Sequence, residues 1–188
     1  MSNLNIYKIT LLALLATLAV VGRIAISFIP NVQPVTSVII LGGIFLGPVA
    51  GIILAILVTF LSNMVLGTGI WTIWQIVSWG LIGVISGIMG KTIKNIPFYV
   101  VIIFSIFSGY LYGLIVSLTN YQITGQGFIA YYLAGLPFDT SHAIGNAVFM
   151  ILLYPTISYV FKKYIQNHLN TNSSVGVQLI PRIWLDCH

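Results

Sequence analysis

Charged side chains are almost absent from this chain, and most of them stand at the edges of long apolar stretches. Hydrophobic residues make up 59% of the chain and charged residues only 5%, with a mean hydropathy of +1.06. A water-soluble surface needs roughly 25% charged residues. The solvent around most of this chain is therefore lipid, and the sequence predicts a polytopic membrane protein.

The apolar stretches divide into six predicted helices. A hydrocarbon core of about 30 Å takes roughly 20 apolar residues per helix, so 188 residues hold about six spans with short loops. The predicted helices cover residues 9–29, 35–46, 49–66, 70–89, 97–117 and 140–161. Gly47-Pro48 breaks the second helix from the third, which makes a tight hairpin, and 120–138 is the longest internal connection. The predicted fold is all-α, with six transmembrane helices.

The basic residues predict the orientation of these helices. Five of them fall on one side of the predicted membrane: Lys8, Lys91, Lys94, Lys162 and Lys163. The loops on the opposite side, at 30–34, 67–69 and 120–138, contain neither Lys nor Arg. Because loops rich in Lys and Arg stay in the cytoplasm, both termini are predicted to be cytoplasmic. The net charge of +5 reports this topology and not nucleic-acid binding, since no basic stripe with interleaved aromatics is present.

The composition changes near residue 167. Residues 1–166 form the predicted six-helix membrane domain, and 167–188 are predicted to be a polar, disordered cytoplasmic tail. Cys187 and His188 end this tail, but two ligands at a chain terminus do not make a metal site. No metal and no cofactor are expected.

Enzyme signatures are absent. The chain has two carboxylates, Asp139 and Asp186, which is too few for paired-acid hydrolysis or for the acid rings of ion-coupled pumps. The segment at 87–92 ends like a phosphate-binding loop, but Ile85 stands where that loop requires its first glycine. We therefore predict that the chain is not an enzyme, and that energy for uphill transport comes from another subunit.

Two charges lie where lipid would penalise them. Arg23, inside the first predicted helix, costs about 2.5–3.5 kcal/mol near the middle of a membrane and should face protein or a water-filled cavity. It is either a ligand anchor or a structural group, paired with Asp139 or bonded to freed carbonyls of a neighbouring helix. Asp139 itself is predicted to cap the sixth helix, with substrate contact as the alternative.

The connection between the first two helices reads Pro30-Asn-Val-Gln-Pro-Val-Thr36. Its prolines fix φ and disfavour helix in the preceding residue, so Asn31 and Gln33 are predicted to sit on an extended, preorganised loop. Such a loop suits hydrogen bonding to a ligand, and Thr36 adds a hydroxyl beside it.

Two further clusters carry amides and aromatic rings. Trp71, Trp74, Gln75 and Trp79 recur at helical spacing after Asn63. Aromatic walls with a few fixed polar groups are typical of an organic-ligand pocket, although interfacial tryptophans are common in membrane proteins. The third cluster supplies the candidates Tyr131, Asp139, His142 and Asn146. His142 and Asn146 share one helical face, where an interhelical hydrogen bond is the alternative to ligand contact.

Together these features resemble the substrate-binding S components of energy-coupling factor (ECF) transporters, over about residues 5–165. The resemblance rests on the length, the six spans, the pattern Leu12-Ala-Leu-Leu-Ala-Thr-Leu-Ala19 running into Gly22-Arg23, the Pro-Asn-Val-Gln-Pro loop, and Ser62-Asn63 before Trp-Thr-Ile-Trp-Gln. It implies a subunit of the bacterial cell membrane that captures a vitamin-like small molecule from outside. It also implies docking on a shared T subunit with two ATPase subunits.

The resemblance extends to a docking motif and to a substrate. In that family a small-x-x-x-small motif on the first helix contacts the coupling subunit, and its counterpart here is Ala13, Ala16 and Thr17, with Thr17 a mild departure. The loop most resembles cobalamin-type S components, while riboflavin, pantothenate and queuosine precursors stay open. A competing hypothesis is a non-transport membrane scaffold in which Arg23, Gln75 and Asp139 fasten helices together.

Overall fold

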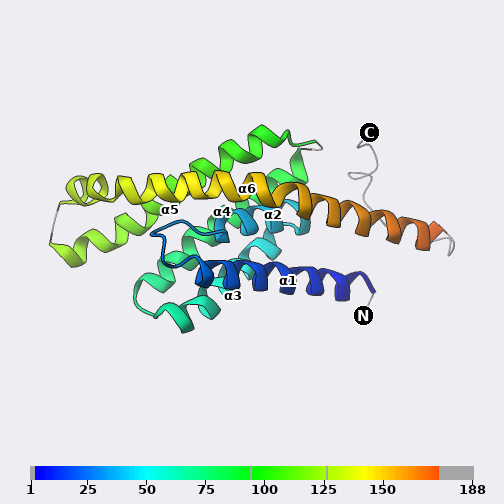
Figure 1. Ribbon diagram of the computed structural model, residues 1–188, viewed down its shortest axis with the longest axis horizontal. Helices are drawn as coiled ribbons and strands as arrows, with labels where there is room; N and C mark the ends of the chain where they lie inside the picture. Colours follow the sequence, from blue (N-terminus) through cyan, green and yellow to red (C-terminus); the bar gives the residue numbers. More distant parts are fainter. Residues whose placement is uncertain (1–2, 94, 126, 174–188) are drawn as a thin grey trace.

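The computed structural model describes residues 3–93, 95–125 and 127–173. Within them the chain forms six helices: α1 (Asn3–Ala25), α2 (Val35–Leu46), α3 (Pro48–Leu66), α4 (Trp71–Thr92), α5 (Phe98–Thr124) and α6 (Phe128–Ser173). The beginning of α1 and the C-terminal part of α6 lie at the same end of the molecule (Figure 1). The predicted all-α fold is confirmed.

Five of the helices in the described ranges are long and apolar enough to cross a membrane. The exception is α2, whose 12 residues reach only about 18 Å against a hydrocarbon core of about 30 Å. Large apolar side chains are exposed on all five long helices, for example Leu14, Phe60, Ile88, Ile103 and Leu152. An apolar outer surface of this extent favours contact with lipid.

The short helix α2 lies at the centre of the fold. Every residue from Val35 to Ile44 is buried, and α2 contacts each of the other five helices in the described chain. Gly47, with φ of 98°, ends α2, and Pro48 begins α3. Glycine tolerates this left-handed backbone and proline suits the first helical position, so the predicted hairpin forms.

Glycines let α3 and α4 approach backbone to backbone. A Cβ atom at Gly51 would lie 2.6 Å from the Gly83 carbonyl oxygen, and one at Gly83 would lie 2.8 Å from the Gly51 carbonyl carbon. Gly87 packs in the same way against the backbone of Pro48. Segment 87–92 is thus the end of a membrane helix that packs closely on its neighbours.

The predicted long connection at 120–138 is wrong, because most of it is helical. α5 continues to Thr124 and α6 begins at Phe128, which leaves a turn at Gly125 with φ of 68°. Pro137 lies inside α6. Membrane helices tolerate an internal proline because neighbouring groups satisfy the freed backbone carbonyl. The predicted capping role of Asp139 is therefore also wrong, since the residue lies within α6.

The ends of the first and last helices also differ from the prediction. α1 ends at Ala25, earlier than the predicted residue 29, and a series of turns follows it. α6 continues to Ser173, past the predicted start of the tail at 167. The rest of that tail, residues 174–188 with Cys187 and His188, lies outside the described residues.

Candidate functional site

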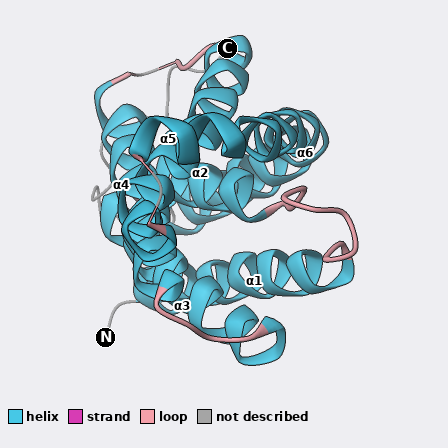
Figure 2. Cartoon of the chain, turned by 90° about the vertical axis from the view of Figure 1, so that its left-hand side faces the viewer, coloured by secondary structure: helices cyan, strands magenta, loops and turns pink. Residues whose placement is uncertain are grey.

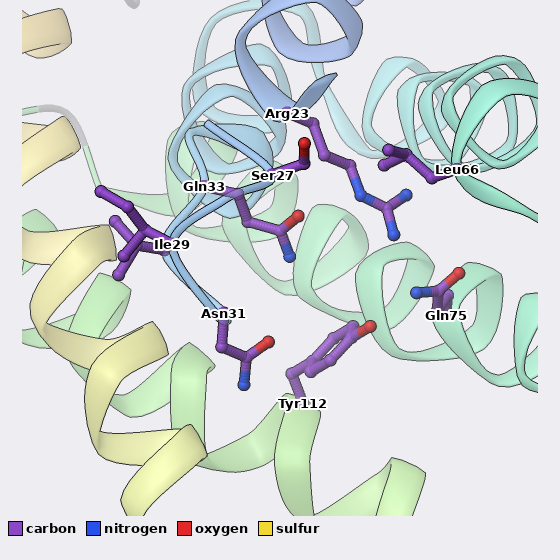
Figure 3. Close-up of a pocket in the computed structure, with 9 residues that line it drawn as sticks. Arg23, Ser27, Ile29, Asn31, Gln33, Leu66, Gln75 and Tyr112 are labelled. Atoms are coloured by element: carbon purple, nitrogen blue, oxygen red, sulfur yellow. The ribbon is translucent and has the colours of Figure 1, made fainter. Parts of the chain in front are cut away.

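A cavity of about 200 Å³ lies beside the loop that joins α1 to α2. Its lining consists of Arg23, Ser27, Ile29, Asn31, Val32, Gln33, Leu66, Gln75 and Tyr112. Figure 3 shows Arg23 of α1, Gln33 of the loop, Gln75 of α4 and Tyr112 of α5 around the same space. The loop that joins α1 to α2, drawn in pink in Figure 2, supplies Asn31 and Gln33 to the lining. Four separate segments of the chain therefore supply polar groups to one cavity.

The Arg23 guanidinium is buried among neutral partners. Arg23 is 9% exposed, and its Nη1 donates hydrogen bonds to Ser62 Oγ at 2.6 Å and to Asn63 Oδ1 at 3.0 Å. Its guanidinium carbon also lies 5.1 Å from the centroid of the Trp79 ring, which is a cation–π contact. Nε of Arg23 has no hydrogen-bond partner in the part of the chain that the structure describes. Among the described residues no ion pair joins Arg23 to Asp139, so the predicted pairing of these two residues is wrong.

Asn63 orients the amide of Gln75. Its Nδ2 donates to Thr72 Oγ1 at 3.0 Å and to Gln75 Oε1 at 2.7 Å, while its Oδ1 accepts from Arg23. Because Oε1 of Gln75 is engaged by Asn63, the amide nitrogen of Gln75 is left to donate elsewhere. The Tyr112 hydroxyl points toward this amide in Figure 3.

A buried layer of aromatic and polar groups lies beneath Tyr112. The ring of Tyr112 lies 5.0 Å from that of Trp79 and 4.9 Å from that of His142, centroid to centroid. Trp79 Nε1 donates to Thr36 Oγ1 at 3.0 Å, and Thr36 Oγ1 lies 2.9 Å from His142 Nε2. This network ties α2, α4, α5 and α6 together and holds the Tyr112 side chain in place.

Asn31 fastens the loop to α6. Its Nδ2 donates to the carbonyl oxygen of Phe138 at 2.9 Å, and its φ is 62°. The left-handed backbone shows that the predicted extended conformation is wrong at Asn31, and asparagine is among the few residues that adopt it readily. Next to it, Val32 packs against Gly145 of α6, where an added Cβ would lie 3.2 Å from Val32 Cγ1.

Residues 7–171 match the family described as ECF transporter, substrate-specific component. The chain belongs to this family. No curated protein and no solved structure matches it. This ECF substrate-specific component is therefore a membrane transporter subunit that binds a small molecule, and not an enzyme. The family also implies a T subunit and ATPase subunits as partners.

The thirteen predicted substrate-binding residues divide by their distance from the cavity. Four line it: Arg23, Asn31, Gln33 and Gln75. Four lie behind the lining, in contact with it or in the buried layer: Thr36, Asn63, Trp79 and His142. Asn146 is buried on α6, where its Nδ2 donates to the Ser105 carbonyl oxygen of α5. The remaining four are not among the lining residues: Trp71, Trp74, Tyr131 and Asp139. Trp71 is 44% exposed, and the Asp139 carboxyl packs against Gly113 of α5.

Sequence reasoning missed two polar lining residues of this ECF component. Ser27 stands four positions after Arg23, a spacing that places the two close together when the chain turns helically. Tyr112 lies in the apolar stretch of α5. A phenol in the middle of a membrane helix needs a partner for its hydroxyl, and that requirement was the available signal.

The predicted docking motif lies on α1, away from the cavity lining. Ala13 and Thr17 are exposed, whereas Ala16 is only 5% exposed and belongs to the core. Thr17 Oγ1 donates to the Ala13 carbonyl oxygen at 2.9 Å. Because this hydroxyl bonds to its own helix, the exposed surface formed by Ala13 and Thr17 is small and largely apolar.

Proposed function

We propose that this ECF component captures a vitamin or vitamin precursor from outside a bacterial cell and delivers it for ATP-driven uptake. The observation that carries the proposal is the convergence of Arg23, Gln33, Gln75 and Tyr112 on one cavity. Polar groups at membrane depth are costly unless they have partners. A bound solute would supply those partners, so the cavity fits the solute-binding role of the family.

We propose that both termini face the cytoplasm. Lys8 near the start of α1 and the pair Lys162-Lys163 belong to the two chain ends that lie together in Figure 1. An orientation with these lysines inside satisfies the positive-inside rule. The loop at 26–34 follows the opposite end of α1, so the cavity would open outward. Under this proposal α2 and the loop before it together make the sixth crossing.

The transport step in this proposal follows from the position of Ala13 and Thr17. Their small exposed surface on α1 would dock on the T subunit, whose two ATPase partners supply the energy. Small residues permit the close backbone approach that helix pairs in a membrane need. Arg23, the lining residue on α1, stands six positions after Thr17, about 9 Å farther along the helix, so substrate and T subunit would bind at the same time.

The size of the cavity bears on the choice of substrate. At about 200 Å³ it is smaller than the roughly 300–1,000 Å³ of most small-molecule pockets. A compact solute such as pantothenate or a queuosine precursor requires less rearrangement than riboflavin. Cobalamin, favoured by the resemblance of the loop, would require the 26–34 loop to move away from α4 and α5. We therefore propose a compact solute first and cobalamin second.

The proposed function is tested by identifying what the purified protein carries. The detergent-solubilised ECF component is analysed by mass spectrometry for bound small molecules, and then titrated calorimetrically with cobalamin and the other vitamins. One vitamin bound tightly at a 1:1 ratio would establish capture and name the substrate. An empty protein that binds none of them would favour the scaffold hypothesis.

Gln75→Ala is expected to weaken solute binding by roughly 2- to 10-fold, because a neutral hydrogen bond contributes about 0.5–1.5 kcal/mol. Calorimetric titration measures the change. Thr92→Ala is the control, since Thr92 is exposed at the end of α4, does not line the cavity, and has a hydroxyl that bonds to its own helix. Equal dissociation constants for the Gln75 and Thr92 variants would contradict a role for the amide in binding.

Asn31→Ala and Asn31→Gly separate the side chain of Asn31 from its backbone. Both variants lose the hydrogen bond to Phe138 and must keep the left-handed backbone, which costs alanine about 1–2 kcal/mol and glycine almost nothing. If the loop covers the bound solute, dissociation is expected to accelerate several-fold for Gly and about 10-fold more for Ala. Stopped-flow release of a bound vitamin gives both rates, and identical rates for the wild type and both variants would show that the loop does not retain the solute.

A further inference from the structure

The charge balance of the cavity points to the chemistry of its solute. We propose that the solute carries an anionic group, a carboxylate or a phosphate, that pairs with the Arg23 guanidinium. This inference rests on the proposed function, and it narrows the substrate class of the same cavity.

The positive charge of Arg23 is not balanced by the protein around it. Its two hydrogen-bond acceptors, Ser62 Oγ and Asn63 Oδ1, are neutral. None of the nine lining residues is acidic. The whole chain has two carboxylates, of which Asp139 packs on Gly113 and Asp186 lies outside the described residues. The described protein therefore leaves a buried cation without a counter-charge.

The guanidinium also keeps unused donor capacity. Arg23 Nη1 makes both hydrogen bonds to α3, whereas the buried Nε has no acceptor among the described residues. The planar, forked guanidinium matches carboxylate and phosphate oxygens, and such charge-assisted bonds are roughly twice as strong as neutral ones. An anion in the cavity would accept hydrogen bonds from the guanidinium and would also balance its positive charge.

The other polar groups of the lining suit an anion as well. The amide nitrogen of Gln75 donates to the Tyr112 oxygen, which leaves the Tyr112 hydroxyl proton to donate into the cavity, and Gln33 and Ser27 add amide and hydroxyl donors. In the structural alternative, the Trp79 ring and two neutral acceptors suffice for Arg23. That alternative leaves Nε unsatisfied and a cation at membrane depth without a counter-charge, an arrangement that is rare in membrane proteins.

The test compares anions with neutral analogues of nearly the same shape. The full-length protein in lipid nanodiscs is titrated with nicotinate and nicotinamide, pantothenate and panthenol, and pyridoxal phosphate and pyridoxal. In parallel it is incubated with a deproteinised small-molecule extract of bacterial cells, and the retained compounds are identified by mass spectrometry. The first two pairs report on carboxylates and the third on phosphates.

We expect the retained compound to be an anion, and we expect any anion that binds to do so roughly 10- to 100-fold more tightly than its neutral analogue. Arg23→Gln should remove this preference, Arg23→Lys should keep part of it, and Thr92→Ala should leave it intact. The comparison of analogues on the wild-type protein needs no variant, so it stands even if Arg23→Gln does not fold.

The contrary outcomes separate this inference from the proposed function. A neutral or cationic compound that is retained tightly, or an anion held equally by the wild type and Arg23→Gln, would overturn the anion proposal and leave solute capture standing. A protein that retains nothing from the extract and binds none of the six compounds would overturn both.

Discussion

Uptake of the solute is expected to fall by about 100-fold or more when Ala13 is replaced by tryptophan, while solute binding changes less than twofold. Ala13 and Thr17 are exposed on α1, and neither lines the cavity. If this surface docks on the T subunit, a tryptophan ring holds the two helices apart, and a loss of about 3 kcal/mol in docking corresponds to roughly 100-fold. Radiolabelled uptake into cells and calorimetric binding to the purified variant measure the two effects separately.

Leu18→Trp is the matched control for this experiment. Leu18 is 42% exposed on the same helix, and five positions at about 100° each place it roughly 140° around the axis from Ala13. The same bulk there should leave both uptake and binding near wild-type levels. Normal uptake by Ala13→Trp, or equal loss in both variants, would show that the Ala13 surface is not where the coupling subunit docks.

The sequence was sufficient to predict the helices where composition and breakers agree. Lipid must surround a chain with 5% charged residues, and Gly47-Pro48 can only separate two helices, so α2 and α3 were placed to within a residue. The crossing by α2 was harder to judge from composition. A stretch of 12 apolar residues reads as a short span, yet every residue from Val35 to Ile44 is buried by its neighbours.

The prediction was wrong where local rules were overruled by tertiary contacts. Polar side chains between 120 and 138 favour a loop, and Asp139 before Thr140 is typical of a helix start. In the structure α5 and α6 are both longer, and they pack closely through glycines, as where Gly109 meets the backbone of Ala143. α6 packs against α5 and stays helical through Pro137. A local sequence pattern does not predict this contact between two helices.

The sequence was sufficient to predict which polar residues gather at the candidate site, but not which of them line the cavity and which lie behind the lining. Arg23 and Gln75 stand out because polarity is costly in a membrane, and Asn31 and Gln33 because prolines stiffen their loop; all four line the cavity. His142 and Trp79 also stand out for their polarity in a membrane, but they bond to Thr36 in the layer behind the lining. Which of two polar residues faces the cavity depends on how its helix is rotated about its axis. The long helices are apolar on most sides, so the sequence pattern does not determine that rotation.

Gly83→Leu is expected to prevent stable folding, because Gly83 of α4 packs directly against the backbone of Gly51 in α3. A Cβ atom at Gly83 would lie 2.8 Å from the Gly51 carbonyl carbon and 2.9 Å from its Cα, and backbone atoms in a helix cannot rotate away as a side chain can. Overpacking usually costs about 1–3 kcal/mol, and a leucine that forces α3 from α4 should exceed that range. Fluorescence-detected size-exclusion chromatography after heating measures the surviving fold.

Gly83→Ala and Gly80→Ala form the matched pair that isolates packing from helix propensity. Both alanines stabilise the helix itself by roughly 0.8–1 kcal/mol, but a Cβ at Gly80 meets no atom within 4 Å. We therefore expect Gly80→Ala to raise the melting temperature slightly and Gly83→Ala to lower it. A melting temperature for Gly83→Ala at or above that of Gly80→Ala would mean that α3 and α4 can separate at little cost. Since Asn63 of α3 orients Gln75 of α4, the contact of these helices also fixes the geometry of the cavity.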